Sequence, residues 1–430
     1  MDDARLRSAA LAGGVVLIAI NLRPAAAAIG PVLHRIQSDT GLPSGWAGAL
    51  TTLPVLCFGL LAPLAPVLAR RLGLRATLAG AMCVLLAGML VRLVPGIGLL
   101  FVGTALAGAA IAIGNVLLPV LVRRDFAQRT ATAMALYTVS LIGFAALAAG
   151  TTVPLADALG GGWRPGLAVW AIPAAGAALT WLPALGRREA PTASAIGADG
   201  FSARALLRQP LAWAVTLFFA VQSGGFYATL AWLPSIFRSH GASESHAGLL
   251  LSLTMAVGIV TALIVPGVAG RWRDQRPLVV GCCVLTAAGL LGILLAPMSA
   301  PYLWTILLGL GQNAAFPLAL MLIVMRGGSV ATTEGLSTMA QSIGYALSSL
   351  APLAVGALHG LTHSWSPALI LLLALIGPQL VIGLAAGRDR QLSPPRADPP
   401  SDAARPAIVG QEPPPSGATG PASGCGGARG

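Results

Sequence analysis

The chain has 430 residues, of which 56% are apolar and only 9% are charged, whereas an average soluble domain carries about 25% charged residues. This composition excludes an ordinary soluble enzyme, a disordered protein and a disulfide-rich secreted scaffold. The formal net charge is +12, and every basic residue is an arginine. Such an apolar chain suits a membrane protein, whereas its basic charge would also suit nucleic-acid binding. The positions of the arginines must decide between these two classes.

Apolar stretches long enough to cross a membrane recur along the whole sequence. A hydrocarbon core about 30 Å thick needs roughly 20 apolar residues of helix. The expected spans lie near residues 11–32, 45–69, 74–95, 98–122, 130–155, 163–184, 210–237, 246–270, 277–297, 301–325, 332–358 and 365–387. Several contain Pro and Gly, which transmembrane helices tolerate because neighbouring helices satisfy the freed backbone groups.

The arginines fit these spans in one orientation. With both termini in the cytoplasm, 21 of the 26 arginines fall in cytoplasmic segments and three fall outside. The remaining two, Arg23 and Arg92, lie within spans. This is the asymmetry of the positive-inside rule. It predicts a multi-pass protein of the cell membrane with both ends inside, surrounded by lipid and not bound to nucleic acid.

The two halves of the sequence resemble each other at an offset near 200 residues. The matched pairs are Ala47–Leu50 with Ala247–Leu250, Arg70/Arg71/Arg75 with Arg271/Arg273/Arg276, Asn115-x3-Pro119 with Asn313-x3-Pro317, and Trp163-x-Pro165 with Trp365-x-Pro367. Their offsets are 200, 201, 198 and 202. Parallel six-span repeats are the signature of the major facilitator fold. We therefore expect an all-α integral membrane protein with twelve transmembrane helices in two pseudo-symmetric six-helix halves.

Composition marks the expected boundaries between the parts of the chain. Residues 1–184 would form the N-terminal six-helix bundle and residues 210–387 the C-terminal one. Residues 185–209 are polar and basic, as expected of a cytoplasmic linker. Residues 388–430 are rich in Pro, Gly, Ala and Ser without periodicity, which predicts a disordered cytoplasmic tail.

Arg23 is the unusual charge within the spans. It lies about twelve residues into the first span, where an arginine costs roughly 2.5–3.5 kcal/mol on insertion scales. None of the 14 acidic residues lies clearly in the middle of a span to pair with it. Arg23 therefore either binds an anionic substrate in a central cavity or ties helix carbonyls together. Arg92 lies three residues before Pro95, and we expect its side chain to reach the interface.

Neutral polar residues form a second set of candidates. Spans 1, 4, 7 and 10 line the cavity in this fold, which gives, beside Arg23, the predicted substrate-binding residues Asn21, Asn115, Gln222, Tyr227, Gln312 and Asn313. Tyr137, Ser140, Gln341 and Tyr345 lie in spans 5 and 11 and are weaker candidates. Each of these side chains could instead join helices by hydrogen bonds, worth about 0.6 kcal/mol each.

Several segments carry a resemblance to a known family. They are Asn21–Pro24, Gly41–Pro43, Ala47–Val55, Gly114–Pro119, Ala231–Pro234 and Gln341–Tyr345. With these segments, the chain resembles the cyanate/2-nitroimidazole transporter family (CynX/NimT) over roughly residues 15–385. The resemblance implies a bacterial inner-membrane transporter of small anions or small nitrogen-containing solutes.

The loop after the second span departs from the superfamily pattern G-x-x-x-D-R-x-G-R-R. Arg70 stands where that pattern has Asp, so the usual carboxylate is missing. Asp125, after the fourth span, could pair with Arg70 or Arg71 instead. We therefore predict a cytoplasmic gating set of Arg70, Arg71, Arg75 and Asp125.

These observations predict a secondary active transporter of a small anionic or polar nitrogen-containing solute, cyanate-like, that works by alternating access. The alternative is an efflux pump for neutral or weakly polar drugs such as nitroimidazoles. A missing catalytic cluster argues against an enzyme, and we expect no cofactor and no metal. By analogy with the fold, we expect a monomer.

Overall fold

The computed structural model describes residues 13–126, 130–185 and 206–392. The predicted tail from residue 393 and most of the predicted linker, residues 186–205, lie outside these ranges, as do the N-terminal arginines Arg5 and Arg7. Within the described ranges every regular element is a helix and there is no strand. The all-α prediction is therefore confirmed.

Within the described ranges, the first half contains nine α-helices and one 3-10 helix after a helical segment that starts at Gly13. They are α2 (Pro24–Ala27), α3 (Ile29–Thr40), α4 (Ser44–Leu61), α5 (Leu64–Leu72), α6 (Leu74–Val91), α7 (Ile97–Asp125), α8 (Thr130–Ala158), α9 (Trp163–Ala168), α10 (Ala171–Trp181) and η2 (Leu182–Ala184). The second half contains α12 (Pro210–Ser239), α13 (Glu244–Arg271), α14 (Arg276–Leu295), α15 (Pro301–Gly327), α16 (Val330–Ser348), α17 (Leu350–Thr362) and α18 (Ser366–Gly387).

Ten helices in the described ranges are long and apolar enough to cross a membrane, and two bent pairs raise the number to twelve. Gly13–Ala27 and Ile29–Thr40 meet at 43°, and Gly45–Leu61 and Leu64–Leu72 meet at 62°. The twelve-span prediction is confirmed. The first span is longer than its predicted end at residue 32, because α3 continues through charged residues to Gly41, whose φ of +69° ends the helix. Hydropathy marks only the part of a helix that lies in lipid.

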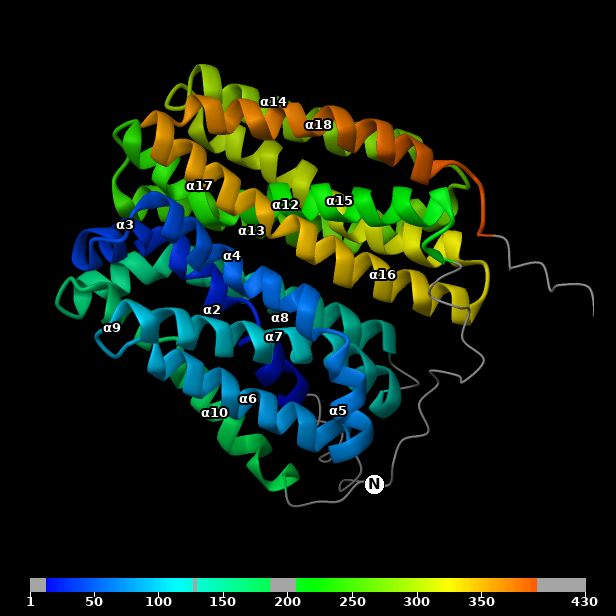
Figure 1. Ribbon diagram of the computed structural model, residues 1–430, viewed down its shortest axis with the longest axis horizontal. Coiled ribbons are helices and arrows are strands. Elements are labelled where there is room, and N and C mark those ends of the chain that lie inside the picture. Colours follow the sequence, from blue (N-terminus) through cyan, green and yellow to red (C-terminus); the bar gives the residue numbers. More distant parts are fainter. Residues whose placement is uncertain (1–12, 127–129, 186–205, 393–430) are drawn as a thin grey trace, which may run out of the picture. The chain divides into compact units, whose positions relative to one another are not determined.

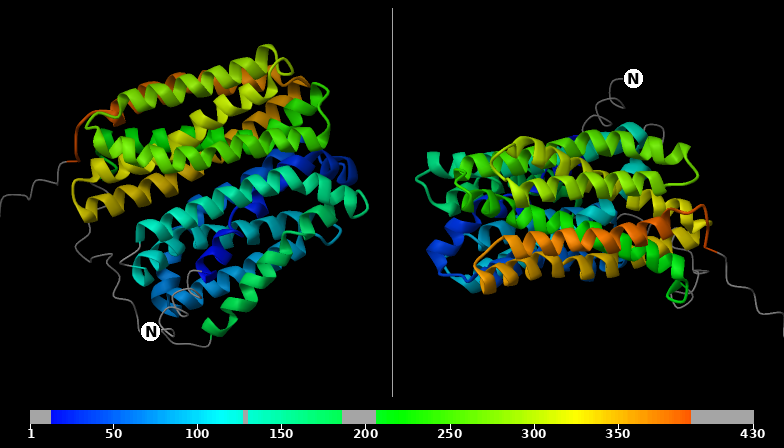
Figure 2. Two further views of the ribbon diagram at one scale, coloured as in Figure 1. Left: turned by 180° about the vertical axis from the view of Figure 1, so that it is seen from behind. Right: turned by 90° about the horizontal axis from the view of Figure 1, so that it is seen from above.

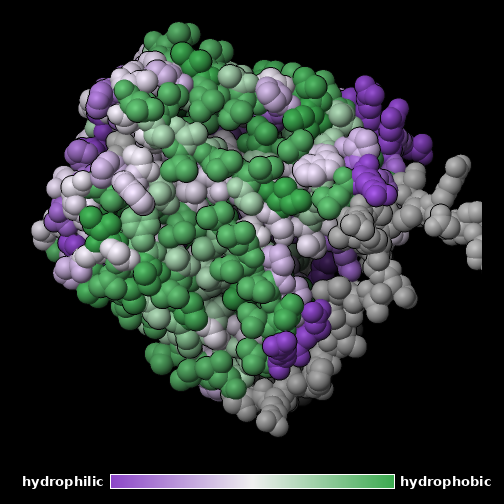
Figure 3. All heavy atoms as spheres, viewed as in Figure 1, coloured by the Kyte–Doolittle hydropathy of each residue, from purple (hydrophilic) through white to green (hydrophobic). Residues whose placement is uncertain are grey.

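Helices α2–α10 lie together as one group and α12–α18 as another (Figure 1), and further views show the same grouping (Figure 2). The groups meet where α8 packs against α13, and where α4 packs against α16 and α17. Apolar side chains cover most of the face in Figure 3, and hydrophilic ones gather at its two ends. This distribution is typical of a protein that spans a bilayer. The residue boundaries of the two bundles and the orientation of the termini stay predictions.

Glycine contacts show how the two halves correspond. A Cβ on Gly108 of α7 would lie 2.8 Å from the Cα of Pro54 in α4. A Cβ on Gly309 of α15 would lie 3.0 Å from the Cα of Thr254 in α13. Small residues let transmembrane helices approach this closely. The two glycines therefore occupy equivalent places, with an offset of 201 residues between α7 and α15.

This register corrects one of the sequence matches. With an offset of 201, Asn115 corresponds to Phe316, whereas the sequence match paired it with Asn313 at an offset of 198. The difference of three residues is close to one helical turn. Asn115 and Asn313 therefore do not occupy equivalent places, although both precede a proline by four residues.

Candidate functional site

The first span is interrupted where Arg23 lies. Residues 20–23 form turns between the helical segment from Gly13 and the short helix α2. Pro24 is the first residue of α2, and proline suits this position because it has no N–H to donate to the preceding turn. Arg23 is the residue before that helix, and the interruption sets its side chain between the two halves.

Arg23 contacts the second half through a tyrosine. Its Nη1 donates a hydrogen bond to the Oη of Tyr227 in α12 at 3.2 Å. Tyr345 in α16 and Tyr137 in α8 also lie near the guanidinium. These are three of the four tyrosines in the chain. Among the residues that the structure describes, no carboxylate forms an ion pair with Arg23.

Aromatic rings from both halves surround the two tyrosines of the second half. We call Phe58, Phe219, Phe226, Tyr227 and Tyr345 the aromatic cluster. Phe58 of α4 lies 5.6 Å from the ring centroid of Tyr345 and 6.0 Å from that of Tyr227. Phe58, like Phe219 and Phe226, was not predicted from the sequence, because an aromatic residue within an apolar span shows no contrast with its neighbours. A burial pattern in three dimensions was needed to find it.

A small pocket lies next to this cluster, between α2, α3, α4 and α12. Ala26, Gly30, Thr51 and Tyr227 are among the residues that line it. Tyr227 thus both lines the pocket and accepts the hydrogen bond from Arg23. Arg23, the aromatic cluster and this pocket together form the candidate substrate site.

Asn21 and Asn313 are used in packing between helices. The Nδ2 of Asn21 donates to the carbonyl oxygens of Leu17 and Pro173, at 2.7 and 3.1 Å. The Nδ2 of Asn313 donates to those of Thr254 and Gly309, at 2.9 and 2.8 Å. Each amide therefore ties its span to a neighbouring helix of the same half.

Asn115, Gln222 and Gln312 differ from the other predicted residues. Asn115 is half-buried and makes no hydrogen bond to a described residue. Gln222 and Gln312 line a separate pocket between α12, α14, α15 and α18, inside the second half. Their Nε2 atoms donate to Ser223 and Thr229, whereas both Oε1 atoms are buried without a partner in the described residues. The structure therefore does not bring the glutamines together with Arg23.

The predicted gating residues only partly come together. Asp125 at the end of α7 accepts hydrogen bonds from Arg75 and Arg124, both at 2.8 Å. The expected pairing with Arg70 or Arg71 is wrong. The 62° bend before α5 leaves both of these arginines exposed, while Arg75 lies in the first turn of α6 beside α7.

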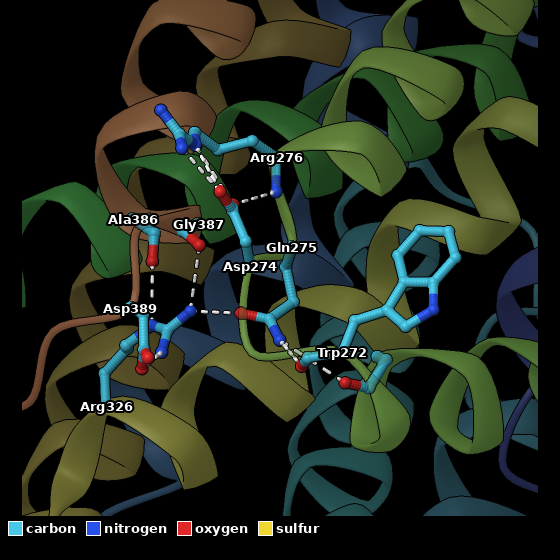
Figure 4. Close-up of polar contacts among 9 residues, drawn as sticks. Trp272, Asp274, Gln275, Arg276, Arg326, Ala386, Gly387 and Asp389 are labelled. Carbon is cyan, nitrogen blue, oxygen red and sulfur yellow. Dashed lines mark hydrogen bonds and ion pairs between the residues drawn. The ribbon is translucent and has the colours of Figure 1, made fainter.

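The corresponding end of the second half is built around a buried arginine (Figure 4). Arg326 of α15 is 1% exposed. Its guanidinium donates to the carbonyl oxygens of Ala386 and Gly387 at the end of α18, both at 3.0 Å, and to the Gln275 side chain. Close by, the Arg276 guanidinium and backbone N–H hold the pKa of the Asp274 carboxyl down at about 2, so this ion pair persists to a lower pH than an ordinary aspartate would allow.

The predicted outer end carries a group of ion pairs, one of which, Arg35–Glu244, crosses between the halves. Arg35 of α3 bonds Asp157 of α8 at 2.7 Å and Glu244 of α13 at 2.5 Å. Glu244 also lies 3.4 Å from Arg238 of α12. Between Arg23 and this end, Gly30 allows α3 to approach the backbone of α12. We call Arg35, Asp157, Glu244 and Arg238 the outer clamp.

Arg92 does not reach the membrane interface as expected. Its side chain is 0% exposed, and its Nη1 donates to the carbonyl oxygen of Ala25 at 2.7 Å. A Cβ on Gly103 of α7 would lie 2.5 Å from the Arg92 backbone nitrogen. Because α6 and α7 pack this closely, the side chain turns inward toward α2.

Comparison with known proteins agrees with this architecture. The profile of the major facilitator superfamily matches residues 15–349. This chain belongs to the major facilitator superfamily. The superfamily and the relatives consist of transporters, so the chain is a multi-pass membrane transporter and not an enzyme.

Curated relatives confirm the resemblance to cyanate and 2-nitroimidazole transporters. The chain is 38% identical to the uncharacterized transporter YycB of Bacillus subtilis, over 90% of this chain and 96% of that protein. It is 36% identical to the 2-nitroimidazole transporter of Escherichia coli, over 89% and 96%. It is 32% identical to the cyanate transport protein CynX of Escherichia coli, over 82% and 90%.

Solved structures share the fold at low sequence identity. A bacterial homologue of the human lysosomal transporter Spinster, in an inward-facing and unoccupied conformation, aligns with a TM-score of 0.71 at 15% identity, over 90% of this chain and 99% of that one. The D-xylose–proton symporter aligns with a TM-score of 0.64 at 15% identity, over 88% and 96%.

Proposed function

We propose that this protein transports a small anionic or polar nitrogen-containing solute, cyanate-like, by alternating access of its two halves around Arg23. The observation that carries the proposal is the Arg23–Tyr227 hydrogen bond, which joins the halves within the membrane and has no described carboxylate beside it. A guanidinium offers a planar fork of donors that suits carboxylates and oxyanions. An anion entering the site would supply the missing negative charge.

The position of the site also suits alternating access. Substrate sites in such transporters lie near the bilayer midplane, between the repeats. Arg23, Phe58 and Tyr137 come from the first half, whereas Tyr227 and Tyr345 come from the second. A solute that contacts residues of both halves would gain or lose contacts when one half moves against the other. The outer clamp and the glycine contact at Gly30 support closure at the predicted outer end.

The aromatic cluster favours one alternative, the export of weakly polar planar compounds such as nitroimidazoles. Rings at 5.0 to 6.3 Å centroid separations, such as those of Phe219, Tyr227 and Tyr345, offer faces and edges for a planar heterocycle. In that case Arg23 would hydrogen-bond a nitro group or act mainly in structure. A relative that bears the name of a 2-nitroimidazole transporter supports keeping this alternative.

Uptake of radiolabelled cyanate into proteoliposomes tests the proposal, with wild type beside Arg23→Ala and Arg23→Lys. We expect saturable uptake by the wild type that falls to background in Arg23→Ala and recovers partly in Arg23→Lys. Equal uptake by wild type and Arg23→Ala would contradict a central anion site. If folded wild type takes up no cyanate, the substrate class fails, and export of 2-nitroimidazole tests the alternative with the same variants.

A further inference from the structure

Arg92 is a buried cation for which the candidate site gives no direct role. Its side chain is fully buried and makes one hydrogen bond, from Nη1 to the carbonyl oxygen of Ala25. Its Nε and Nη2 atoms are buried without a hydrogen-bond partner in the described residues. A buried charge with no opposite charge beside it is costly, and intramembrane arginines therefore mark functional regions.

The carbonyl oxygen that Arg92 contacts is free because the first span bends there. Within α2 the N–H of Ala28 bonds the carbonyl oxygen of Pro24. No backbone N–H among the described residues bonds that of Ala25 across the 43° bend between α2 and α3. An unpaired carbonyl in the membrane interior is unfavourable by several kcal/mol in an isolated helix. Arg92 fills this gap from α6.

The same short helix carries the substrate-binding residue that we propose. Arg23 is the residue before α2, two positions from Ala25. A four-residue helix between two interruptions has few backbone hydrogen bonds of its own, so outside contacts decide where it lies. Two residues before Arg23, the Nδ2 of Asn21 donates to the carbonyl oxygen of Pro173 in α10. Arg23 is thus flanked by two contacts that fix its backbone.

We infer that Arg92 is a positioning residue for Arg23: its hydrogen bond to Ala25 holds α2 where the Arg23 guanidinium meets Tyr227 and the substrate. The inference rests on the proposed role of Arg23. Arg92 acts through the backbone of α2 and does not touch the substrate. Its uncompensated charge lies in the same half and adds to the positive potential that an anion meets.

A matched control exists in the second half. Arg326 is also buried and also donates to backbone carbonyl oxygens, those of Ala386 and Gly387, but at the end of α18 and away from the aromatic cluster. Replacing either arginine by Met removes a buried cation and keeps a long side chain. A general effect on folding would appear in both variants, whereas an effect on the site would appear only in Arg92→Met.

The test measures cyanate uptake by Arg92→Met, Arg92→Lys, Arg326→Met and Arg23→Ala in proteoliposomes. We expect Arg92→Met to raise the apparent KM about tenfold, the size of one charged hydrogen bond, with little change in the maximal rate. Arg92→Lys should recover most of the affinity, and Arg326→Met should lower thermal stability without changing KM. In the Tyr227→Phe background the Arg92→Met effect on KM should shrink, because both changes release the same guanidinium.

A second measurement needs no substrate. Butanedione modifies exposed guanidinium groups, and mass spectrometry follows its rate at Arg23. We expect Arg92→Met and Tyr227→Phe each to speed this reaction about threefold, and Arg326→Met to leave it unchanged. An unchanged rate and KM in Arg92→Met would overturn the inference, even if Arg23→Ala abolishes uptake. If Arg23→Ala leaves uptake intact while butanedione still distinguishes Arg92→Met, the proposed function fails and the positioning contact stands.

Discussion

In the second half, the buried Arg326 donates to two carbonyl oxygens and to Gln275 and lies 3.9 Å from the Asp389 carboxylate, so its charge is compensated within its own half. In the first half, Arg92 has one acceptor, and Arg23 has a single hydrogen bond that crosses to Tyr227. The two halves therefore differ in how many acceptors surround their buried arginines. The second half uses its arginine to close a helix end, whereas the first half keeps positive charge available near the centre.

Among the variants that compare the halves, we expect the largest effect on transport when the Tyr227 hydroxyl group, the acceptor for Arg23, is removed. Tyr227→Phe keeps the ring and loses the acceptor, so we expect the apparent KM for the transported anion to rise about tenfold. Gln312→Met, which changes the separate pocket of the second half, should alter KM by less than about twofold. Similar losses in both variants would place the glutamine pocket in the transport path and remove the distinction.

The span count, the repeat and the presence of Arg23 within a span could be predicted from the sequence. Hydropathy, arginine asymmetry and a lone charge in an apolar stretch can all be read directly from the residues. The sequence could not separate Asn313 from Asn115, since both have the same N-x3-P setting. Only the packing of Gly309 and Gly108 shows that the two lie one turn apart in the repeat. Arg92 was predicted to reach the interface because no sequence pattern indicates the close packing at Gly103, which turns the Arg92 side chain inward.

The two asparagines give a second comparison between the halves. Asn313→Ala removes two hydrogen bonds to backbone carbonyl oxygens, so we expect about 1 kcal/mol lower stability and a lower melting temperature, with transport retained. Asn115→Ala removes no described hydrogen bond and should leave the melting temperature unchanged. Thermal unfolding in detergent measures both. A larger loss of stability in Asn115→Ala than in Asn313→Ala would reverse the assignment of their roles.

We expect the smallest effect from the outer clamp, the contact between the halves at their predicted outer end. The quantity tested is how often this end opens. Arg35 and Glu244 are 20% and 18% exposed, so their pair contributes only about 1 kcal/mol. We expect Arg35→Gln and Glu244→Gln each to open the outer end about threefold more often, and the double variant to add little. The probe is the rate at which an impermeant thiol reagent, added outside, labels Thr51→Cys beside the pocket after the five native cysteines are replaced.

A pair at the same end provides the control for this measurement. Asp39 of α3 accepts a hydrogen bond from Arg164 of α9 at 2.7 Å, and both residues belong to the first half. Asp39→Asn removes an ion pair of similar geometry without touching the contact between halves, so the labelling rate of Thr51→Cys should not change. If Asp39→Asn speeds labelling as much as Glu244→Gln does, the effect is a general loosening of the outer loops. If only the pair that crosses between halves matters, Arg35 links the half that carries Arg23 to the half that carries Tyr227, and its ion pair sets how readily the site opens.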